Sequence, residues 1–456
     1  MNIDNMSKKE LLEECIKLGI TKCKSKNKSE LITLIREHTI QMTTEQSPPV
    51  NENIVVENAI ASGLTFIDLF CGIGGFHQAL KNMNGVCKFA SDIDENCRKT
   101  YFNNYGLKPE GDITKVNTEN IEPFDVLCGG FPCQPFSKAG FQRGFDDDRG
   151  NLFFTICNIV KHHKPKYLLL ENVRNLSSHD DGNTWKVIYE NIDKMGYYTY
   201  SEPLILNVLH FNIPQNRERV IIMCKRKDLG ALPELPSIVK NPKQTLTRHV
   251  SDFMINEVDG DVLKYKIKGK QKEVEIVWDK FIKILIRHNI DMPKFPLWTD
   301  WWDNDFEKED AFYVKYTNWI DKNREFYNTH KAALQEWLMT SRTNKLWVGA
   351  VRKFEWQAGE LLKEDGMHNV LWTARGSGIR VKRCDYIPTL VAMSMIPVYG
   401  PQSRTLSPRE LLRLQSFPDT FKYDEKNIYK QIGNAVNVTM VERCARFLIY
   451  GEPLFV

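Results

Sequence analysis

The stretch that decides the fold is residues 64–76, LTFIDLFCGIGGF. Its apolar first half predicts a buried β-strand, and its glycines predict a tight turn that leads into a helix over residues 76–83. A second strand is expected over residues 87–91, and the acidic residue Asp92 follows it. This order is typical of the first half of a doubly wound α/β sheet, in which a nucleotide ligand lies at the carboxyl edge.

The glycine turn favours a nucleoside ligand over a dinucleotide. Its spacing differs from the one that cradles a pyrophosphate, and no Gly-Lys-Ser/Thr sequence follows it. Asp92 is placed to hold ribose hydroxyls. Asp112, also expected at a strand end, is a weaker candidate that can accept from an adenine amino group. The alternative is a turn that only tightens the junction between strand and helix.

A rigid loop presents Cys133. Residues 125–137, DVLCGGFPCQPFS, read as the end of a buried strand followed by a loop whose prolines, Pro132 and Pro135, fix two φ angles. A thiol held on such a loop is a nucleophile once it is deprotonated. A buried structural cysteine is the alternative.

Three later segments add charged or polar groups. Residues 166–173, KYLLLENV, predict an apolar strand that ends in Glu171, at the edge where open α/β sheets place their chemistry. Residues 213–219, IPQNRER, place Arg217 and Arg219 just before an expected strand over residues 220–224, with a solvated or ion-paired role as the alternative. Residues 431–436, QIGNAV, predict a turn into a helix that ends near residue 448.

In this order and spacing, six segments resemble motifs of the DNA cytosine-C5 methyltransferases, especially the single-chain enzymes of restriction-modification systems. The resemblance covers residues 64–230 and 386–456 and departs at Ile93, where many members carry a larger apolar or aromatic residue. The segments are residues 68–76, 130–137, 171–173, 215–219, 404–410 and 433–436.

The resemblance implies a Rossmann-like α/β methyltransferase domain with S-adenosylmethionine at its carboxyl edge, a smaller target-recognition domain, and duplex DNA between them. Cys133 would add to C6 of a cytosine extruded from the duplex, Glu171 would hold N3 and the exocyclic amine, and Arg219 would contact O2. The implied cofactor residues are Phe70, Gly72, Gly74, Gly75, Asp92, Ile93, Asp112, Ile113, Pro132, Leu152 and Asn434. The implied DNA-binding residues are Gln134, Ser137, Arg217, Arg380, Arg383 and Thr389.

Two alternative functions stay open at this point. An RNA cytosine-C5 methyltransferase acting on tRNA would share the scaffold, although the sequence after Cys133 and an insert of well over a hundred residues argue against it. An inactive DNA-binding regulator is the other alternative, and the presence of Cys133, Glu171 and Arg219 argues against it.

Composition excludes several classes of protein. The 62 basic and 58 acidic residues give a net charge of +4, so any basic surface for nucleic acid must be local. Eleven cysteines occur without Cys-x-x-Cys pairs or zinc spacing, which argues against a disulfide scaffold and a structural metal and favours a reducing compartment. Without a signal-peptide pattern or a long apolar run, we expect a soluble, intracellular monomer in a bacterial cytoplasm, or in a host cell if the protein is viral.

The N-terminus predicts a helical arm. Residues 7–20, SKKELLEECIKLGI, begin with a Ser and Glu capping box, and residues 29–36 predict a second helix. The pair resembles a SAP-type hairpin that binds DNA, with a hairpin for protein contacts or a charged appendage as the alternative. We expect five segments: the hairpin 1–40, a linker 41–62, the catalytic domain 63–229, the recognition domain 230–385 and the rest of the catalytic domain 386–456.

The expected recognition domain is the least patterned segment. Residues 240–272 predict short strands, and residues 275–288 and 318–339 predict helices. Three tryptophans between residues 298 and 302 are expected in a buried core rather than stacked on bases. Residues 375–383, RGSGIRVKR, are better placed for DNA, because flexible glycines bring the backbone near phosphates and four basic residues supply counter-charge; Arg380 or Arg383 can equally read a guanine edge. Residues 388–390 resemble the Thr-Leu pair that the family keeps at the far end of this domain.

Overall fold

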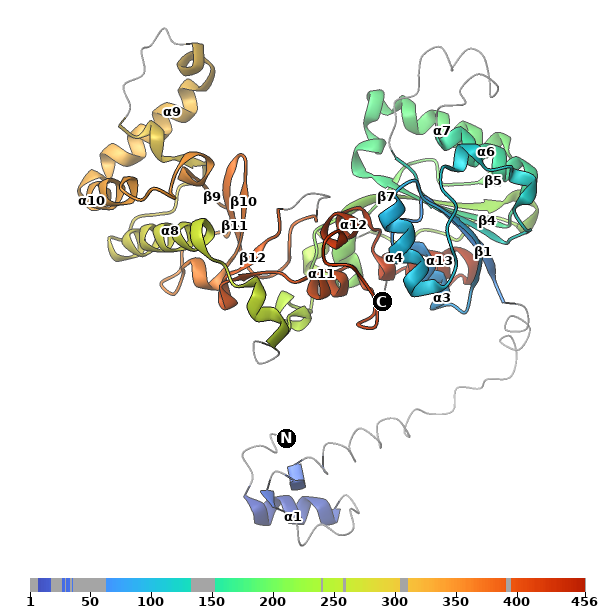
Figure 1. Ribbon diagram of the computed structural model, residues 1–456, viewed down its shortest axis with the longest axis horizontal. Helices are drawn as coiled ribbons and strands as arrows, with labels where there is room; N and C mark the ends of the chain where they lie inside the picture. The colour runs from blue at the N-terminus through green and yellow to red at the C-terminus, as the bar shows by residue number, and fades with distance from the viewer. Residues whose placement is uncertain are drawn as a thin grey trace. The chain divides into compact units, whose positions relative to one another are not determined.

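The computed structural model describes residues 7–17, 27–28, 30–32, 35, 63–132, 152–238, 241–256, 260–303, 311–390 and 395–455. The predicted linker and three predicted site residues, Cys133, Gln134 and Ser137, lie outside the described residues. The chain divides into two units, Met1–Gly63 and Leu64–Val456, and each is a separate body (Figure 1).

The small unit contains the predicted first helix, α1 (Lys8–Lys17). The capping box is confirmed, because the Ser7 N–H donates to the Glu10 carboxylate at 2.7 Å and the Glu10 N–H donates to Ser7 Oγ at 3.4 Å. A second capping pair joins Asn27 and Glu30, so the second helix begins about two residues earlier than predicted. Its core among the described residues consists of Leu11, Cys15, Leu31 and Ile35.

The large unit is built on a mixed sheet, as predicted. Within the described residues it has seven strands in the order β2-β1-β3-β4-β7-β5, with β6 paired to β7. The first four strands are parallel, and β7 is antiparallel to β4, β5 and β6. The strands are β1 (Thr65–Leu69), β2 (Val86–Ser91), β3 (Val126–Gly130), β4 (Tyr167–Val173), β5 (Tyr197–Tyr198), β6 (Leu204–Asn207) and β7 (Glu218–Arg226).

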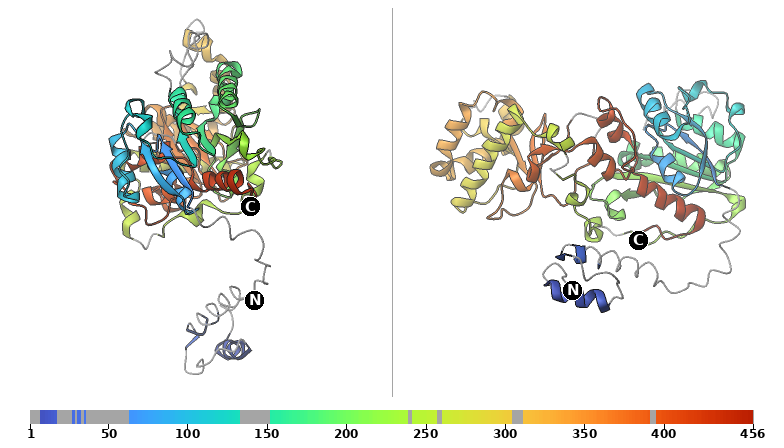
Figure 2. Two further views of the ribbon diagram at one scale, coloured as in Figure 1. Left: turned by 90° about the vertical axis from the view of Figure 1, so that its right-hand side faces the viewer. Right: turned by 60° about the horizontal axis from the view of Figure 1, so that its bottom comes forward.

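Helices cover both faces of this sheet (Figure 2). Phe66 of β1 packs in the cluster of α3 (Gly75–Lys81) and α13 (Val438–Tyr450). Ile67 and Leu69 point the other way, into the cluster of α6 (Leu152–His163) and α7 (Asn183–Lys194). This alternation buries both faces of the strand, which is why its sequence is almost continuously apolar. Helix α4 (Glu95–Tyr105) packs beside the start of α3 through Tyr101 and Tyr105.

The antiparallel direction of β7 is what brings the site together. Because β7 runs against β4, its first residues lie beside the last residues of β4, and Arg219 is paired in register with Val173. The carboxyl ends of β1 to β4 and the amino end of β7 therefore share one edge of the sheet. Residues that are far apart in the sequence, such as Asp92, Glu171 and Arg219, come from this edge.

A second sheet, in the expected recognition region, has the order β13-β12-β10-β11-β9-β8 among the described residues. Its strands are β8 (Leu297–Trp298), β9 (Lys353–Trp356), β10 (Leu371–Arg375), β11 (Gly378–Lys382), β12 (Val398–Tyr399) and β13 (Arg404–Thr405). The sheet thus extends past the expected boundary at residue 385. Helices α8 (Gly269–Arg287) and α10 (Lys331–Arg342) pack against one face through an aromatic core (Figure 1). The chain then forms α11 (Pro408–Leu414) and α12 (Ile428–Asn434).

Several predictions for this region were wrong. Between residues 242 and 265 the described chain forms short 3-10 helices instead of strands, because Asn241 and Asp252 accept backbone N–H bonds locally. The single helix predicted over 318–339 is two helices, α9 (Ala311–Thr329) and α10, which meet at His330. Residues 375–383 form the turn and second strand of a hairpin, and no secondary structure was predicted for them. The buried aromatic core was predicted correctly, since Trp301 and Trp302 are 6% and 2% exposed.

Candidate active site

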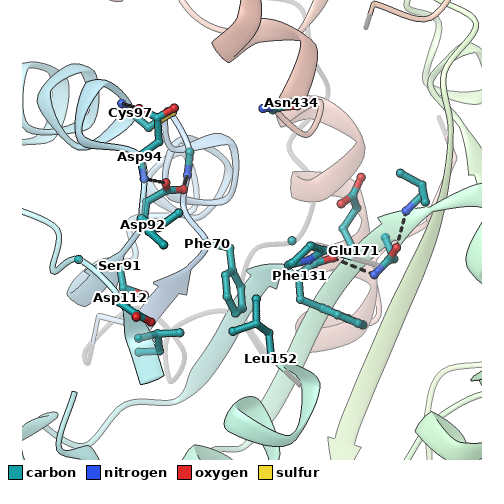
Figure 3. A pocket seen from close by; sticks show the side chains of 18 of the residues that line it. Phe70, Ser91, Asp92, Asp94, Cys97, Asp112, Phe131, Leu152, Glu171 and Asn434 are labelled. Carbon is teal, nitrogen blue, oxygen red and sulfur yellow. Dashed lines mark hydrogen bonds between the residues drawn. The ribbon is translucent and has the colours of Figure 1, made fainter. Parts of the chain in front are cut away.

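A cavity of about 500 Å³ opens at the carboxyl edge of the first sheet. Figure 3 shows Asp92 and Asp112 on one side of it, Glu171 on the other, and Phe70 and Leu152 between them. Its lining includes nine of the predicted site residues that are described: Phe70, Gly72, Asp92, Ile93, Asp112, Ile113, Pro132, Leu152 and Asn434. Glu171 and Arg219 line it as well, so the structure brings the predicted cofactor and catalytic residues to one place.

Asp92 organises the acidic end of the cavity. One carboxylate oxygen accepts the Gly72 N–H at 2.8 Å, and the other accepts the Asp94 N–H at 2.8 Å. Burial raises the pKa of Asp92 above its ordinary value, although these two backbone bonds work in the opposite direction. The residue therefore joins the glycine turn to the start of α4, and its remaining lone pairs are available to a ligand hydroxyl.

Asp112 and Ile93 complete this end. Asp112 was predicted at the end of a strand, but it caps a short 3-10 helix instead. Its carboxylate accepts from the Thr114 N–H and hydroxyl at 3.1 and 2.7 Å. Its bonds to Thr114 lower the pKa of Asp112, which keeps the carboxylate charged. Ile93 is 79% exposed and offers an apolar surface to a flat ring.

The three glycines of the turn, Gly72, Gly74 and Gly75, do not all face the cavity. Gly72 lines the cavity, whereas Gly74 and Gly75 do not. A Cβ atom on Gly74 would lie 2.3 Å from the Tyr105 ring, and one on Gly75 would lie 2.6 Å from a Val436 methyl. These two glycines are therefore needed for close packing of the turn, and their direct contact with the cofactor stays a prediction.

Glu171 and Arg219 form an ion pair at the opposite end of the cavity. Arg219 Nε lies 2.6 Å from Glu171 Oε1, and both side chains are almost buried, at 12% and 13% exposure. Low exposure keeps such a pair from being screened by water and salt. The pair presents one carboxylate and one guanidinium side by side, a donor and acceptor set that matches the polar edge of a pyrimidine.

The loop that carries Cys133 is described only up to Pro132, which lines the cavity. Asn172, which sequence reasoning missed, anchors this loop because its side chain donates to the Phe131 carbonyl at 2.8 Å. Asn172 is 1% exposed and neighbours Glu171 on β4. The sequence signal that could have identified Asn172 is its position as a polar residue within an otherwise apolar strand.

Arg217 has a structural role, because the structure buries the side chain that was predicted to contact DNA. The side chain is 1% exposed, and its guanidinium donates to the carbonyls of Leu390, Gly433 and Ala435 at 3.0, 3.1 and 2.8 Å. Burial lowers the pKa of Arg217 to about 9. The residue thus fixes the C-terminal segment that brings Asn434 to the cavity.

Two predicted DNA-binding residues are also engaged inside the protein. Arg383 donates to both carboxylate oxygens of Asp365 and to the carbonyls of Ala358 and Glu360, so its guanidinium is not free for a base. The Thr389 hydroxyl donates to the Asn216 carbonyl at 2.6 Å. Arg380, by contrast, stays 37% exposed beside Glu355.

Two buried groups near the cavity had no sequence signal. Ser91 lines the cavity, and its hydroxyl is buried without a hydrogen-bond partner among the described residues. The carboxylate of Asp68 on β1 is likewise buried and has no side-chain partner within that part of the chain, and burial raises the pKa of this residue well above its ordinary value although the His77 backbone works in the opposite direction. Asp68 lies within an apolar strand, so the sequence pattern predicted only a strand residue at this position.

Metal-binding and membrane-spanning features are absent from the described part of the chain. It contains no group of three His, Cys, Asp or Glu residues placed to hold a metal ion. None of the nine cysteines in that part of the chain forms a disulfide bond. No helix within it is both long and apolar enough to cross a membrane.

The Rossmann-like sheet, the acid-lined cavity at its carboxyl edge and the Glu–Arg pair define an enzyme of the Rossmann-like methyltransferase class. The family model "C-5 cytosine-specific DNA methylase" matches residues 64–449, and the chain belongs to this family. It is a DNA cytosine-C5 methyltransferase that uses S-adenosylmethionine as the methyl donor.

Three relatives illustrate the similarity. The chain is 31% identical to the type II methyltransferase M.AluI of Cellulosimicrobium cellulans, over 84% of this chain and 91% of that protein. It is 31% identical to M.HpaII of Haemophilus parainfluenzae, over 84% and 89%. Identity reaches 46% with M.HhaI of Haemophilus parahaemolyticus, over 39% of this chain and 54% of that protein.

Proposed function

We propose that the protein methylates C5 of one cytosine within a specific sequence of duplex DNA, through a transient bond between Cys133 and C6 of a base flipped out of the helix. The observation that carries this proposal is the Glu171–Arg219 pair at the end of the cofactor cavity. A base inside a duplex cannot reach a pair that is 12% and 13% exposed, so the cytosine must leave the stack.

Each catalytic residue has a distinct task in this proposal. The Cys133 thiolate adds to C6, which makes C5 nucleophilic. Glu171 holds the N3 edge of the base and shares a proton with it, and Arg219 donates to O2 and stabilises the negative charge that develops on the ring. Once C5 carries the methyl group, the C5 proton is lost and Cys133 departs from C6, which restores the aromatic ring.

The cavity fits the adenosyl part of S-adenosylmethionine, which supplies the methyl group when it is bound. The carboxylate of Asp92 can accept from the ribose hydroxyls, and Asp112 can accept from the adenine amine. Ile93 and Phe70 offer apolar surface to the adenine ring, and the unpartnered Ser91 hydroxyl is a polar atom that a ligand would satisfy.

We further propose that the hairpin of β10 and β11 reads the DNA sequence, within a recognition domain that is inserted in the catalytic domain at about residues 230–385. Thr373, Arg375 and Arg380 lie on the face opposite the aromatic core, because side chains alternate along each strand. Arg375 Nε is buried and has no partner in the described part of the chain. Burial and the nearby Arg380 lower the pKa of Arg375.

The hairpin proposal predicts that Arg380→Met changes sequence preference more than it changes chemistry. A bidentate contact to guanine discriminates by about 1–3 kcal/mol, so relaxed methylation at one position of the motif is expected in bisulfite maps. Arg383→Met is the matched control. If both variants methylate the same sequence motif, the assignment of Arg380 to base reading is contradicted.

The catalytic proposal is tested with duplex DNA that contains 5-fluorocytosine, which lacks the proton needed to release the enzyme. Wild type should form a covalent adduct in the presence of S-adenosylmethionine, and Cys133→Ser should form none while still binding the cofactor. An adduct with Cys133→Ser would show that another residue is the nucleophile. Substituted tRNA offered in parallel separates DNA from RNA as the substrate.

The N-terminal unit is proposed as a DNA-binding arm that resembles a SAP hairpin. Its capped helices and four-residue core support a small folded unit, and the sequence between them carries Lys22, Lys24, Lys26 and Lys28. Deleting residues 1–62 should leave the methylated motif unchanged and reduce the salt slope of DNA binding by about one for each phosphate that the arm neutralises. Equal salt slopes for both proteins would reject the arm, and a changed motif would place it in recognition.

A further inference from the structure

Ile93 stands in an unusual position for a residue that lines a cofactor cavity. It is 79% exposed, so packing of its side chain does not fix where it lies. Asp92, next to it, must hold its carboxylate toward the same ligand. The position of this dipeptide therefore depends on what its backbone contacts.

One side chain contacts the backbone of both residues. Arg98, one turn into α4, donates from the same nitrogen, Nη1, to the Asp92 carbonyl at 2.8 Å and to the Ile93 carbonyl at 3.0 Å. A charged donor shared by two adjacent carbonyls restricts the rotation of the peptide between them, and such bonds are stronger than neutral ones.

Helix α4 is itself fixed to the other wall of the cavity. Lys430 of α12 lies 3.2 Å from the Asp94 carboxylate that caps α4, and the Thr100 hydroxyl donates to Gln431 at 3.2 Å. Gly433 and Asn434, at the end of α12, line the cavity. Arg98 therefore acts from a helix whose position is set by the opposite wall.

We propose that Arg98 is a positioning residue for the cofactor: its guanidinium holds the backbone of Asp92 and Ile93 in the conformation that receives the adenosyl group. The residue does not line the cavity and touches neither the methyl group nor the cytosine. It should therefore affect binding of the cofactor and not the chemical step. This inference rests on the proposed cofactor contacts of Asp92 and Ile93.

The test compares Arg98→Gln, Arg98→Lys and Lys99→Gln in the full-length protein. Lys99 is the matched control because it is adjacent on α4 and pairs on the surface with Glu95, at 2.7 Å. Calorimetry with S-adenosylmethionine and with its demethylated product S-adenosylhomocysteine measures the dissociation constants, and steady-state assays give KM and kcat.

Arg98→Gln should raise both dissociation constants and the KM for S-adenosylmethionine about tenfold, with kcat at saturation within twofold of wild type. Arg98→Lys should recover part of the loss, because an ammonium group can still donate to one carbonyl, and Lys99→Gln should match wild type. Equal dissociation constants for Arg98→Gln and Lys99→Gln would overturn the inference, as would a lower kcat with unchanged KM.

The melting temperature of each variant shows whether it is folded. If Arg98→Gln does not fold, Arg98→Lys decides: weaker cofactor binding than Lys99→Gln supports the inference, and equal binding overturns it. Failure of wild type to bind either compound would instead reject the proposed cofactor site.

Discussion

Replacing Arg217 with methionine separates the structural role of this arginine from the DNA contact that the sequence predicted. Methionine keeps most of the apolar stem and removes the guanidinium. The buried carbonyls of Leu390 and Gly433 would be deprived of donors that now lie 3.0 and 3.1 Å away, and the Ala435 carbonyl would keep only its bond from Gln415 Nε2 at 3.3 Å. Each buried acceptor left without a partner costs about 1–3 kcal/mol, and relief from burying a cation offsets part of that cost.

We expect a net decrease of about 3 kcal/mol in the free energy of unfolding, which corresponds to a melting temperature lower by roughly 3–4 °C for a unit as large as residues 64–456. Arg226→Met is the matched control on the same strand, β7. Arg226 bonds to Asp228 at 2.7 and 3.0 Å, but the pair is 31% and 60% exposed. An exposed pair contributes about 0–1 kcal/mol, so the control should melt close to wild type.

Calorimetry of the full-length proteins measures the melting temperatures, and a salt titration of DNA binding accompanies it. The salt slope of Arg217→Met should match wild type at a temperature where the variant is folded. The reasoning is refuted if Arg217→Met has the same melting temperature as Arg226→Met and its salt slope of DNA binding falls by about one. That result is expected if Arg217 neutralises a phosphate.

Three further outcomes are expected. Gly74→Ala should lower the melting temperature by more than a surface Gly→Ala change does, because the new Cβ would lie 2.3 Å from the Tyr105 ring and φ is +88°; equal effects would contradict the packing role. Asp68→Asn should be more stable than wild type, and the difference should grow as the pH rises above about 4. The pKa of Asp68 is raised in the folded state, so wild type loses stability as this carboxyl ionises. Unfolding at a series of pH values measures the difference in free energy of unfolding, and a difference that does not grow with pH would contradict the prediction. Asp92→Ala should weaken S-adenosylmethionine binding by about 1–3 kcal/mol in calorimetry, and an unchanged dissociation constant would leave Asp92 a purely structural role.

The sequence by itself determined the class of fold and the content of the catalytic site. Apolar runs that end in glycine, cysteine or glutamate predicted parallel strands with chemistry at their carboxyl ends, and Glu171 and Arg219 do line one cavity. These predictions worked because each depends on a local pattern: strand periodicity, a glycine turn or the residue at a strand end.

Only the tertiary structure decided which arginines are available and how the recognition region folds. Arg217 and Arg219 are two residues apart in one motif, yet one is buried among carbonyls and the other faces the cavity. Arg383 is tied to Asp365, whereas Arg380, which pairs with Glu355 at 2.9 Å, stays 37% exposed. Whether a guanidinium is free depends on partners from distant segments, and short 3-10 helices and edge strands depend on their neighbours in space, so local sequence patterns do not encode either outcome.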